Sequence, residues 1–192
     1  MSDDDLLAVV LQRLQSFERS VFRLESRDDY VSDAEDDELR QWFAGEPMRL
    51  HLDPDGTDYQ RRVHAACEAG KTWRRVHAVT APTPYVRWEV EGYAQNEVAG
   101  EEIGILQARD LIEVFGEQPP DFWLVDDVVV LEMRYDAAGR IAEVPVITDP
   151  EQMARYRRLR DIALVRAIPV RVYRGILRRQ TIPAPSLPVE AT

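Results

Sequence analysis

The chain has 192 residues and a formal net charge of −11, from 24 basic and 35 acidic side chains. Its hydrophobic content of 45% argues against wholesale disorder, because it is enough for a packed core. A single cysteine excludes an intrachain disulfide and fits a reducing cytoplasm, and the acidic start differs from the basic start of a secretory signal. No apolar run reaches the roughly 18 residues of a membrane span, and the negative charge disfavours direct nucleic-acid binding.

Charge is distributed unevenly along the chain. Residues 1–60 hold sixteen acidic against six basic side chains, and residues 61–150 hold sixteen against nine. Residues 151–180 hold two acidic side chains against nine arginines. These arginines could form a basic face for nucleic acid or an acidic partner. We favour a solvated helix face that complements the acidic N-terminal segment, within the chain or across a homodimer. The arginines concerned are Arg155, Arg157, Arg158, Arg160 and Arg166.

Hydrophobic periodicity predicts alternating helices and strands in the first half of the chain. Thr57 followed by Gln60 indicates a capping box at the start of one helix. The expected helices cover residues 4–18, 34–44, 58–69 and 85–96, and the expected strands cover residues 21–25, 73–80 and 102–106.

The second half predicts three successive strands and a long final helix. The strands are expected over residues 121–126, 128–135 and 140–147. Pro150 at the first helical position, with Asp149 or Thr148 as the cap, indicates the start of the helix. Pro169 breaks its pattern, and residues 181–192 are expected to be disordered. The order predicts a single α/β domain over residues 1–180, with helices flanking a mixed sheet that is parallel early and antiparallel late.

One short motif suggests catalysis. Asp53-Pro54-Asp55-Gly56-Thr57 resembles the first motif of haloacid-dehalogenase-type phosphatases, in which the first aspartate is the nucleophile and the second an acid or base. However, residues 48–52 do not form the pattern of a buried parallel strand. Residues 76–80 could mimic the second motif of that family, but Lys71 precedes them instead of following them. We therefore favour a turn that leads into a capped helix.

The sequence predicts no metal site and no cofactor. His64 and Cys67 lie three apart on a predicted helix and could share a metal ion, but tetrahedral zinc needs at least three protein ligands. His77 alternates with apolar residues on a predicted strand and is interpreted as structural. No glycine-rich phosphate-binding loop occurs.

Several segments occur together in an order that resembles a known family. They are Phe22-Arg23-Leu24-Glu25 with Tyr30, Arg74–His77 running to Pro82, Tyr85–Glu89, Asn96 with Ala99–Glu101, Asp121–Asp127, and Ala167-Ile168-Pro169 with Tyr173. Over about residues 17–174 the chain is similar to an uncharacterised actinobacterial family catalogued only as a domain of unknown function. Its members are often encoded beside Xre-type helix-turn-helix regulators. The resemblance implies a role beside such a regulator and no established activity.

A more distant resemblance concerns the fold. An apolar strand ending in Asp126-Asp127, two further strands and a long helix ending in Ala167-Ile168-Pro169 are similar to the phospholipase-D-like domains of bacterial regulators. Those domains usually lack the catalytic His-x-Lys-x4-Asp motif. The chain lacks it too, because Ala69 stands two places before its only lysine, Lys71. The resemblance implies a phospholipase-D-like half-domain without the catalytic motif, and the phosphoryl-transfer chemistry of that fold is not predicted.

Polar members of the family pattern are the candidate ligand-binding residues. They lie on the second strand, the following helix and the next loop, where strand ends of an α/β sheet form a crevice. Arg75 and Arg87 could clamp an anion, or could instead pair with carboxylates that hold helix to sheet. The candidates are Arg75, Tyr85, Arg87, Asn96 and Glu101.

The sequence therefore predicts a cytoplasmic, non-catalytic regulatory or interaction domain. It would bind a small anionic effector or a helix-turn-helix regulator. The alternative is a metal-dependent hydrolase or phosphatase that uses Asp53 and Asp55, or an unrecognised biosynthetic enzyme. No DNA-reading helix pair is expected, because Pro169 interrupts the basic segment. The oligomeric state and the identity of the partner stay open.

Overall fold

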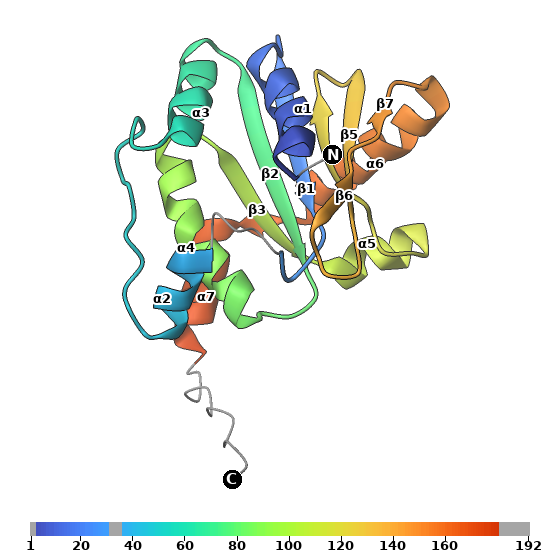
Figure 1. Ribbon diagram of the computed structural model, residues 1–192. Helices are drawn as coiled ribbons and strands as arrows, with labels where there is room; N and C mark the ends of the chain where they lie inside the picture. Colours follow the sequence, from blue (N-terminus) through green and yellow to red (C-terminus); the bar gives the residue numbers. More distant parts are fainter. Residues whose placement is uncertain (1–2, 31–35, 181–192) are drawn as a thin grey trace.

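The computed structural model describes residues 3–30 and 36–180, in which helices and strands alternate (Figure 1). The tail at 181–192 and the first two residues of the helix expected over 34–44 lie outside the described residues. In chain order the elements are α1 (Asp3–Gln15), β1 (Ser20–Glu25), α2 (Asp36–Phe43), α3 (Asp58–Glu68), β2 (Thr72–Val79), α4 (Pro84–Val98), β3 (Glu102–Gln107), α5 (Ala108–Phe115), β4 (Asp121–Val125), β5 (Val129–Tyr135), β6 (Ile141–Glu143), β7 (Val146–Ile147), α6 (Pro150–Arg166), β8 (Ile168–Pro169) and α7 (Val170–Arg179).

Within the described ranges, eight strands form one mixed sheet. The strand order is β6-β5-β4-β1-β2-β3-β8, and β7 pairs with β5. β1, β2 and β3 are parallel neighbours, whereas β4, β5, β7 and β8 join the sheet in antiparallel pairs. The prediction of an α/β domain with a mixed sheet, parallel early and antiparallel late, is confirmed. No helix in the described ranges is both long enough and apolar enough to cross a membrane.

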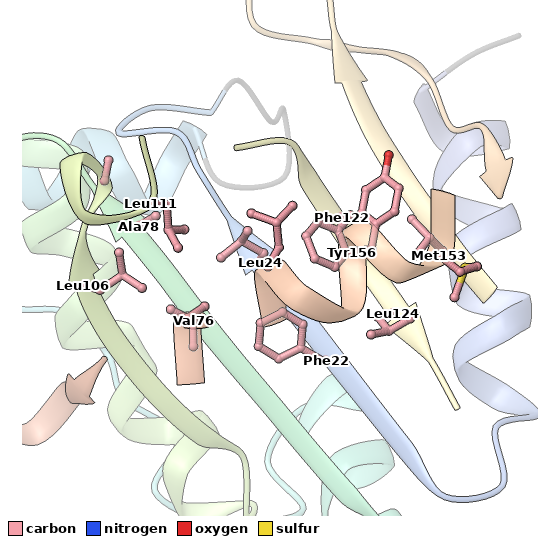
Figure 2. Close-up of a cluster of buried hydrophobic side chains, with 14 residues drawn as sticks. Phe22, Leu24, Val76, Ala78, Leu106, Leu111, Phe122, Leu124, Met153 and Tyr156 are labelled. Carbon is pink, nitrogen blue, oxygen red and sulfur yellow. The ribbon is translucent and has the colours of Figure 1, made fainter. Parts of the chain in front are cut away.

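One face of the sheet carries a continuous apolar core beneath α5 and α6. Alternate strand residues face this core, including Phe22 and Leu24 of β1 and Val76 of β2. The ring of Phe122 on β4 meets the ring of Tyr156 on α6 at a centroid distance of 5.0 Å. Figure 2 shows these side chains gathered between the strands and the helix that crosses them. β1 is buried along nearly all its length because helices cover both faces of the sheet.

The opposite face is apolar at its two sides and polar in its middle. On one side α1 and α3 pack on the sheet around Trp73 and Trp123, whose rings meet edge to face at 6.3 Å. On the other side α4 and α7 pack around Tyr93 and Ile105. α1 lies in front of the sheet in Figure 1, and α6 lies behind it. Buried charged side chains of β1 and β2 separate the two apolar clusters.

Side-chain caps begin two of the predicted helices as expected. Thr57 Oγ1 accepts a hydrogen bond from the Gln60 backbone N–H at 3.1 Å, which caps α3. Asp149 Oδ1 accepts one from the Gln152 N–H at 2.9 Å, which caps α6. Pro150 follows at the first helical position, where its missing N–H has no intrahelical role.

The prediction of one continuous strand over residues 140–147 is wrong. The structure divides it into β6 and β7, which both pair with β5. Pro145 lies between them and has no N–H to donate to a ladder, although its carbonyl accepts from Glu132 N–H at 3.1 Å.

Two helices are absent from the prediction. α5 follows β3 with no loop and is only 8 residues long, too short for a clear periodic pattern. α7 begins directly after Pro169, which by sequence pattern indicates only a break. Its buried residues Val170, Tyr173 and Leu177 have helical spacing, so the proline precedes a new helix and does not begin a coil.

The arginines of α6 contact acidic and backbone groups late in the chain. Arg157 donates two hydrogen bonds to the Asp127 carbonyl, at 2.9 and 2.6 Å, and Arg160 pairs with the Asp127 carboxylate at 2.5 Å. Arg155 pairs with Glu117 at 2.5 Å. The two others contact α5 through the pairs Arg158–Phe115 and Arg166–Asp110. Among the described residues these contacts lie outside the acidic N-terminal segment that we expected the arginines to complement.

Asp126 joins the turn after β4 to the chain that enters β1. It adopts a left-handed backbone conformation, with φ of +52°. Its carboxylate accepts backbone hydrogen bonds from Glu18 at 2.8 Å, from Arg19 at 2.6 Å and from Ser20 at 2.9 Å. Burial acts to raise the pKa of Asp126, but the three N–H donors outweigh it, so the pKa lies below its ordinary value.

We predict that Asp126→Asn destabilises the fold by about 0.5–1.5 kcal/mol at neutral pH, because a charged acceptor of backbone hydrogen bonds is lost at a largely solvent-accessible place. The ionised carboxylate contributes its full stability above the ordinary aspartate pKa of about 3.9 and loses it as pH falls through the lowered native pKa. Urea unfolding from pH 7 to pH 2 should therefore show the gap between wild type and variant narrowing below about pH 4. A constant gap would contradict this role.

Candidate functional site

The polar middle of the second face is a buried network of charged and hydroxyl side chains. Arg23 and Glu25 of β1 and Arg75 and His77 of β2 point to this face, and the parallel register places Arg23 beside Arg75 and Glu25 beside His77. Glu25 is the last residue of β1, so it lies at the carboxyl end of this strand. β1 and β2 are parallel, and ligand sites form at the carboxyl ends of parallel strands in α/β sheets. The other members of this buried network are Tyr30, Tyr59, Glu89, Tyr93, Glu101 and Asp121.

Arg75 joins three elements. Its Nε donates to Glu101 at 2.8 Å, its Nη1 to Glu25 at 2.5 Å and its Nη2 to the Tyr59 hydroxyl at 2.8 Å. Tyr59 in turn donates to Glu101 at 3.0 Å. Burial raises the pKa of Glu101, and Arg75 limits that rise. Burial acts on Glu25 in the same direction, but the positive charges of Arg75 and Arg23 outweigh it and hold its pKa below the ordinary value.

Arg23 holds the β4 side of the network. Its guanidinium forms a buried ion pair with Asp121 and lies 5.1 Å from the centroid of the Trp123 ring. Tyr30 donates a second hydrogen bond to the Asp121 carboxylate at 2.5 Å. Burial raises the pKa of Asp121, and its contacts with Arg23 and Tyr30 oppose that rise. The carboxylate of Asp121 is therefore already occupied by partners from the same chain.

His77 is fully buried, and its two ring nitrogens have different surroundings. Nε2 lies 2.7 Å from the Arg27 carbonyl, which can only accept, so Nε2 carries a proton. Nδ1 lies 3.1 Å from a Glu89 oxygen and 3.2 Å from the Tyr93 hydroxyl. Burial opposes protonation of the ring, but the negative charges of Glu89 and Glu25 outweigh it and raise the pKa of His77 to about 9.

A cavity of about 350 Å³ opens beside the network, between α3, α4 and the loop before α3. Arg75, Glu89 and Tyr93 contribute to its wall, so the network reaches this space. Gln60 shapes the wall, because its amide nitrogen donates to the His51 carbonyl at 2.7 Å and to the Gln95 carbonyl of α4 at 2.9 Å. A second cavity, of about 420 Å³, meets the network at Asp121.

The structure brings together three of the five candidate ligand-binding residues. Arg75 and Asn96 line the 350 Å³ cavity, and Glu101 is bound to Arg75. Tyr85 is buried and packs on Trp88, with ring centroids 5.5 Å apart.

Arg87 points elsewhere, toward the Pro82 and Leu177 carbonyls, at 3.2 and 3.5 Å. Arg75 and Arg87 therefore do not form the expected anion clamp. The alternative, in which arginine–carboxylate pairs connect elements, describes the Arg75 contacts with Glu25 and Glu101.

Asp53 and Asp55 lie in an exposed turn before α3. The Asp53 carboxylate accepts the Asp55 N–H at 3.0 Å, and its carbonyl accepts the Gly56 N–H at 2.9 Å. The preceding residues 48–52 form no strand. The structural context of the phosphatase motif, a nucleophile at the end of a buried strand, is therefore missing, and the turn that we favoured is present.

Sequence reasoning missed Glu25, Glu89 and Tyr93 as members of a site and interpreted His77 as structural. One signal was available. Arg23 and Glu25 alternate with apolar residues on one predicted strand, and Arg75 and His77 do so on another. Two such polar pairs on strands of an α/β sheet indicate a polar patch. The contribution of Glu89 had no such signal, because it depends on how α4 packs on the sheet.

Comparison with known proteins identifies the family. A family model described as a domain of unknown function, DUF6879, matches residues 8–175, and the chain belongs to this family. No curated protein matches the chain.

Two solved structures share a general likeness in fold. NucT from Helicobacter pylori has a TM-score of 0.47 and 10% identity, with 87% of this chain and 92% of that chain covered. TrmBL2, an archaeal chromatin protein whose structure shows a mode of DNA binding, has a TM-score of 0.45 and 13% identity, with 87% of this chain and 52% of that chain covered.

We predict that Arg75→Met lowers the free energy of unfolding by about 3–5 kcal/mol, because two buried carboxylates lose their cation. Arg74→Met is the matched control. Arg74 is the adjacent residue of the same strand, but its pair with Glu102 at 2.8 Å is solvent-exposed and should contribute about 0–1 kcal/mol. Urea denaturation of both variants measures the difference. Equal losses of the free energy of unfolding in the two variants would show that the buried contacts of Arg75 contribute no more than the exposed pair of Arg74.

Proposed function

We propose that this domain is a non-catalytic regulatory module whose effector site is the cavity between α3 and α4. The observation that supports it best is a buried donor that has no hydrogen-bond partner among the described residues, Trp88 Nε1, in a residue that lines this cavity. A buried donor or acceptor without a partner costs about 1–3 kcal/mol, and a bound ligand can recover that cost. At the second cavity, in contrast, Asp121 is paired with Arg23 and Tyr30.

The polar groups around the cavity indicate the class of effector. Arg49 is exposed at its rim and has no ion-pair partner among the described residues, and His51 lies beside it in sequence and in the cavity wall. Together with the Trp88 N–H they supply donors for an anionic group. Asn96 adds an amide that can donate or accept. We therefore propose a small molecule with an anionic group at the rim and an uncharged polar part toward the network.

Arg75 serves this site as a positioning residue. Three of its nitrogens already donate to Glu25, Glu101 and Tyr59, so it holds the wall of the cavity in place and does not clamp the effector. A buried ionic network is weak evidence for stability, because well-packed apolar residues of similar volume are often at least as stabilising. A network of this kind that borders a cavity favours a functional role.

We predict that small anions bind at this cavity in the micromolar to millimolar range. The probes are inorganic phosphate, succinate and a nucleoside monophosphate, measured by the rise in unfolding temperature with concentration. A double variant, Arg49→Ala with Trp88→Phe, should weaken binding at least about tenfold, or about 1.4 kcal/mol. Arg171→Ala removes an exposed arginine on α7 and should have no effect. Failure of all three probes, or equal binding by both variants, would contradict the proposal.

The partner of the module is proposed from the family resemblance. Domains of this pattern are often encoded beside Xre-type helix-turn-helix regulators in actinobacteria, and we propose that this chain acts in the cytoplasm with such a regulator. We predict that the two proteins, expressed together, elute as one complex in size-exclusion chromatography. Separate elution at micromolar concentrations of both proteins would contradict the partnership. It would not contradict effector binding, which the anion probes test separately.

A further inference from the structure

The buried network contains more negative than positive fixed charge. Its carboxylates are Glu25, Glu89, Glu101 and Asp121, and its guanidiniums are Arg23 and Arg75. Two negative charges are therefore left over if His77 is neutral, and one if its ring is protonated. Uncompensated charge in a buried place is costly, so the network favours a further cation.

The contacts of His77 Nδ1 leave room for a cation at this nitrogen, which is either a proton or a metal ion. The Tyr93 hydroxyl has one proton, which it donates to Glu25 at 2.6 Å, so it cannot also donate to Nδ1 at 3.2 Å. The remaining neighbour of Nδ1 is a Glu89 oxygen at 3.1 Å, which is an acceptor. Nδ1 therefore either holds a proton itself or offers its lone pair to a metal ion. Apart from His77 Nδ1, this Glu89 oxygen has no hydrogen-bond partner among the described residues, so it can ligate the same metal ion.

The geometry suits a metal ion. Ligand atoms of Glu25, His77 and Glu89 all lie within 4.8 Å of one another. Two ligands about 2.0–2.1 Å from a zinc ion at a tetrahedral angle are about 3.3 Å apart, close to the separation of the His77 and Glu89 atoms. Neighbouring groups also orient two of these ligands. The Arg27 carbonyl holds Nε2–H, which directs Nδ1 to the site, and Tyr93 orients Glu25.

We propose that Glu25, His77 and Glu89 bind one divalent transition-metal ion, of which Zn²⁺ and Mn²⁺ fit an imidazole with two carboxylates. A divalent ion would balance the two leftover charges of the network. The ion would enter through the cavity, because Glu89 and Tyr93 line it. This site is independent of the effector proposed above, which contacts the rim and Trp88.

The test is isothermal titration of the full chain, treated with EDTA and dialysed, with Zn²⁺ and with Mn²⁺. Wild type should bind one ion per chain, and Glu89→Gln should weaken that binding at least about tenfold. Glu91→Gln is the matched control on α4, since Glu91 pairs with Arg178 away from the cluster. His64→Gln is the second control, because His64 and Cys67 on α3 are the other pair that could hold zinc.

Equal affinity of wild type, Glu91→Gln and His64→Gln, with weaker binding by Glu89→Gln, supports the site. Circular dichroism reports whether each variant is folded. If Glu89→Gln does not fold, Glu89→Asp keeps the charge but withdraws the carboxylate, and its reduced affinity supports the site in the same way. Absence of saturable binding, binding lost in His64→Gln, or full affinity in the Glu89 variants would overturn the proposal.

Discussion

The buried contacts of the Arg75 guanidinium fix the arrangement of the elements around the cavity between α3 and α4. Arg75 stands in the middle of a sheet face and holds Glu25 of β1, Glu101 at the entry to β3 and Tyr59 of α3. These partners come from separate elements. The ion pairs connect β1, β2 and the entry to β3, and the hydrogen bond to Tyr59 fixes α3 relative to the sheet. The wall of the 350 Å³ cavity depends on that placement, because Tyr59 and Arg75 both contribute to it.

The same face shows why the network is better explained by binding than by folding. Both of its sides are closed by apolar clusters, and the other face of the sheet is apolar throughout its core. Apolar packing was therefore available to this fold, and buried ion pairs seldom improve on it. The His77–Glu89 contact lies where the network meets the cavity. The network that carries the excess negative charge is therefore accessible from solvent at this contact.

Much of the fold was predictable from local pattern, and the site was predictable only in part. Caps at Thr57 and Asp149 and the alternation of β1 and β2 depend on neighbouring residues, so sequence reasoning found them. Whether Arg87 or Glu89 faces the sheet does not depend on neighbouring residues in the sequence. These residues are two apart on α4, so they point to different sides of the helix, and only the packing of α4 decides which one faces the sheet. The structure turns Glu89 toward His77 and Arg87 toward α7.

If the His77–Glu89 contact holds a metal ion, the two ring nitrogens of His77 should respond differently to zinc. Nitrogen-15 NMR of the histidine ring, recorded before and after one equivalent of Zn²⁺, reports each ring nitrogen separately. We expect Nδ1 of His77 to become metal-bound and to carry no proton, while Nε2 keeps the proton that it donates to the Arg27 carbonyl. Two protonated nitrogens on His77 in the presence of zinc would contradict this expectation and leave the His77–Glu89 contact as an ordinary buried ion pair.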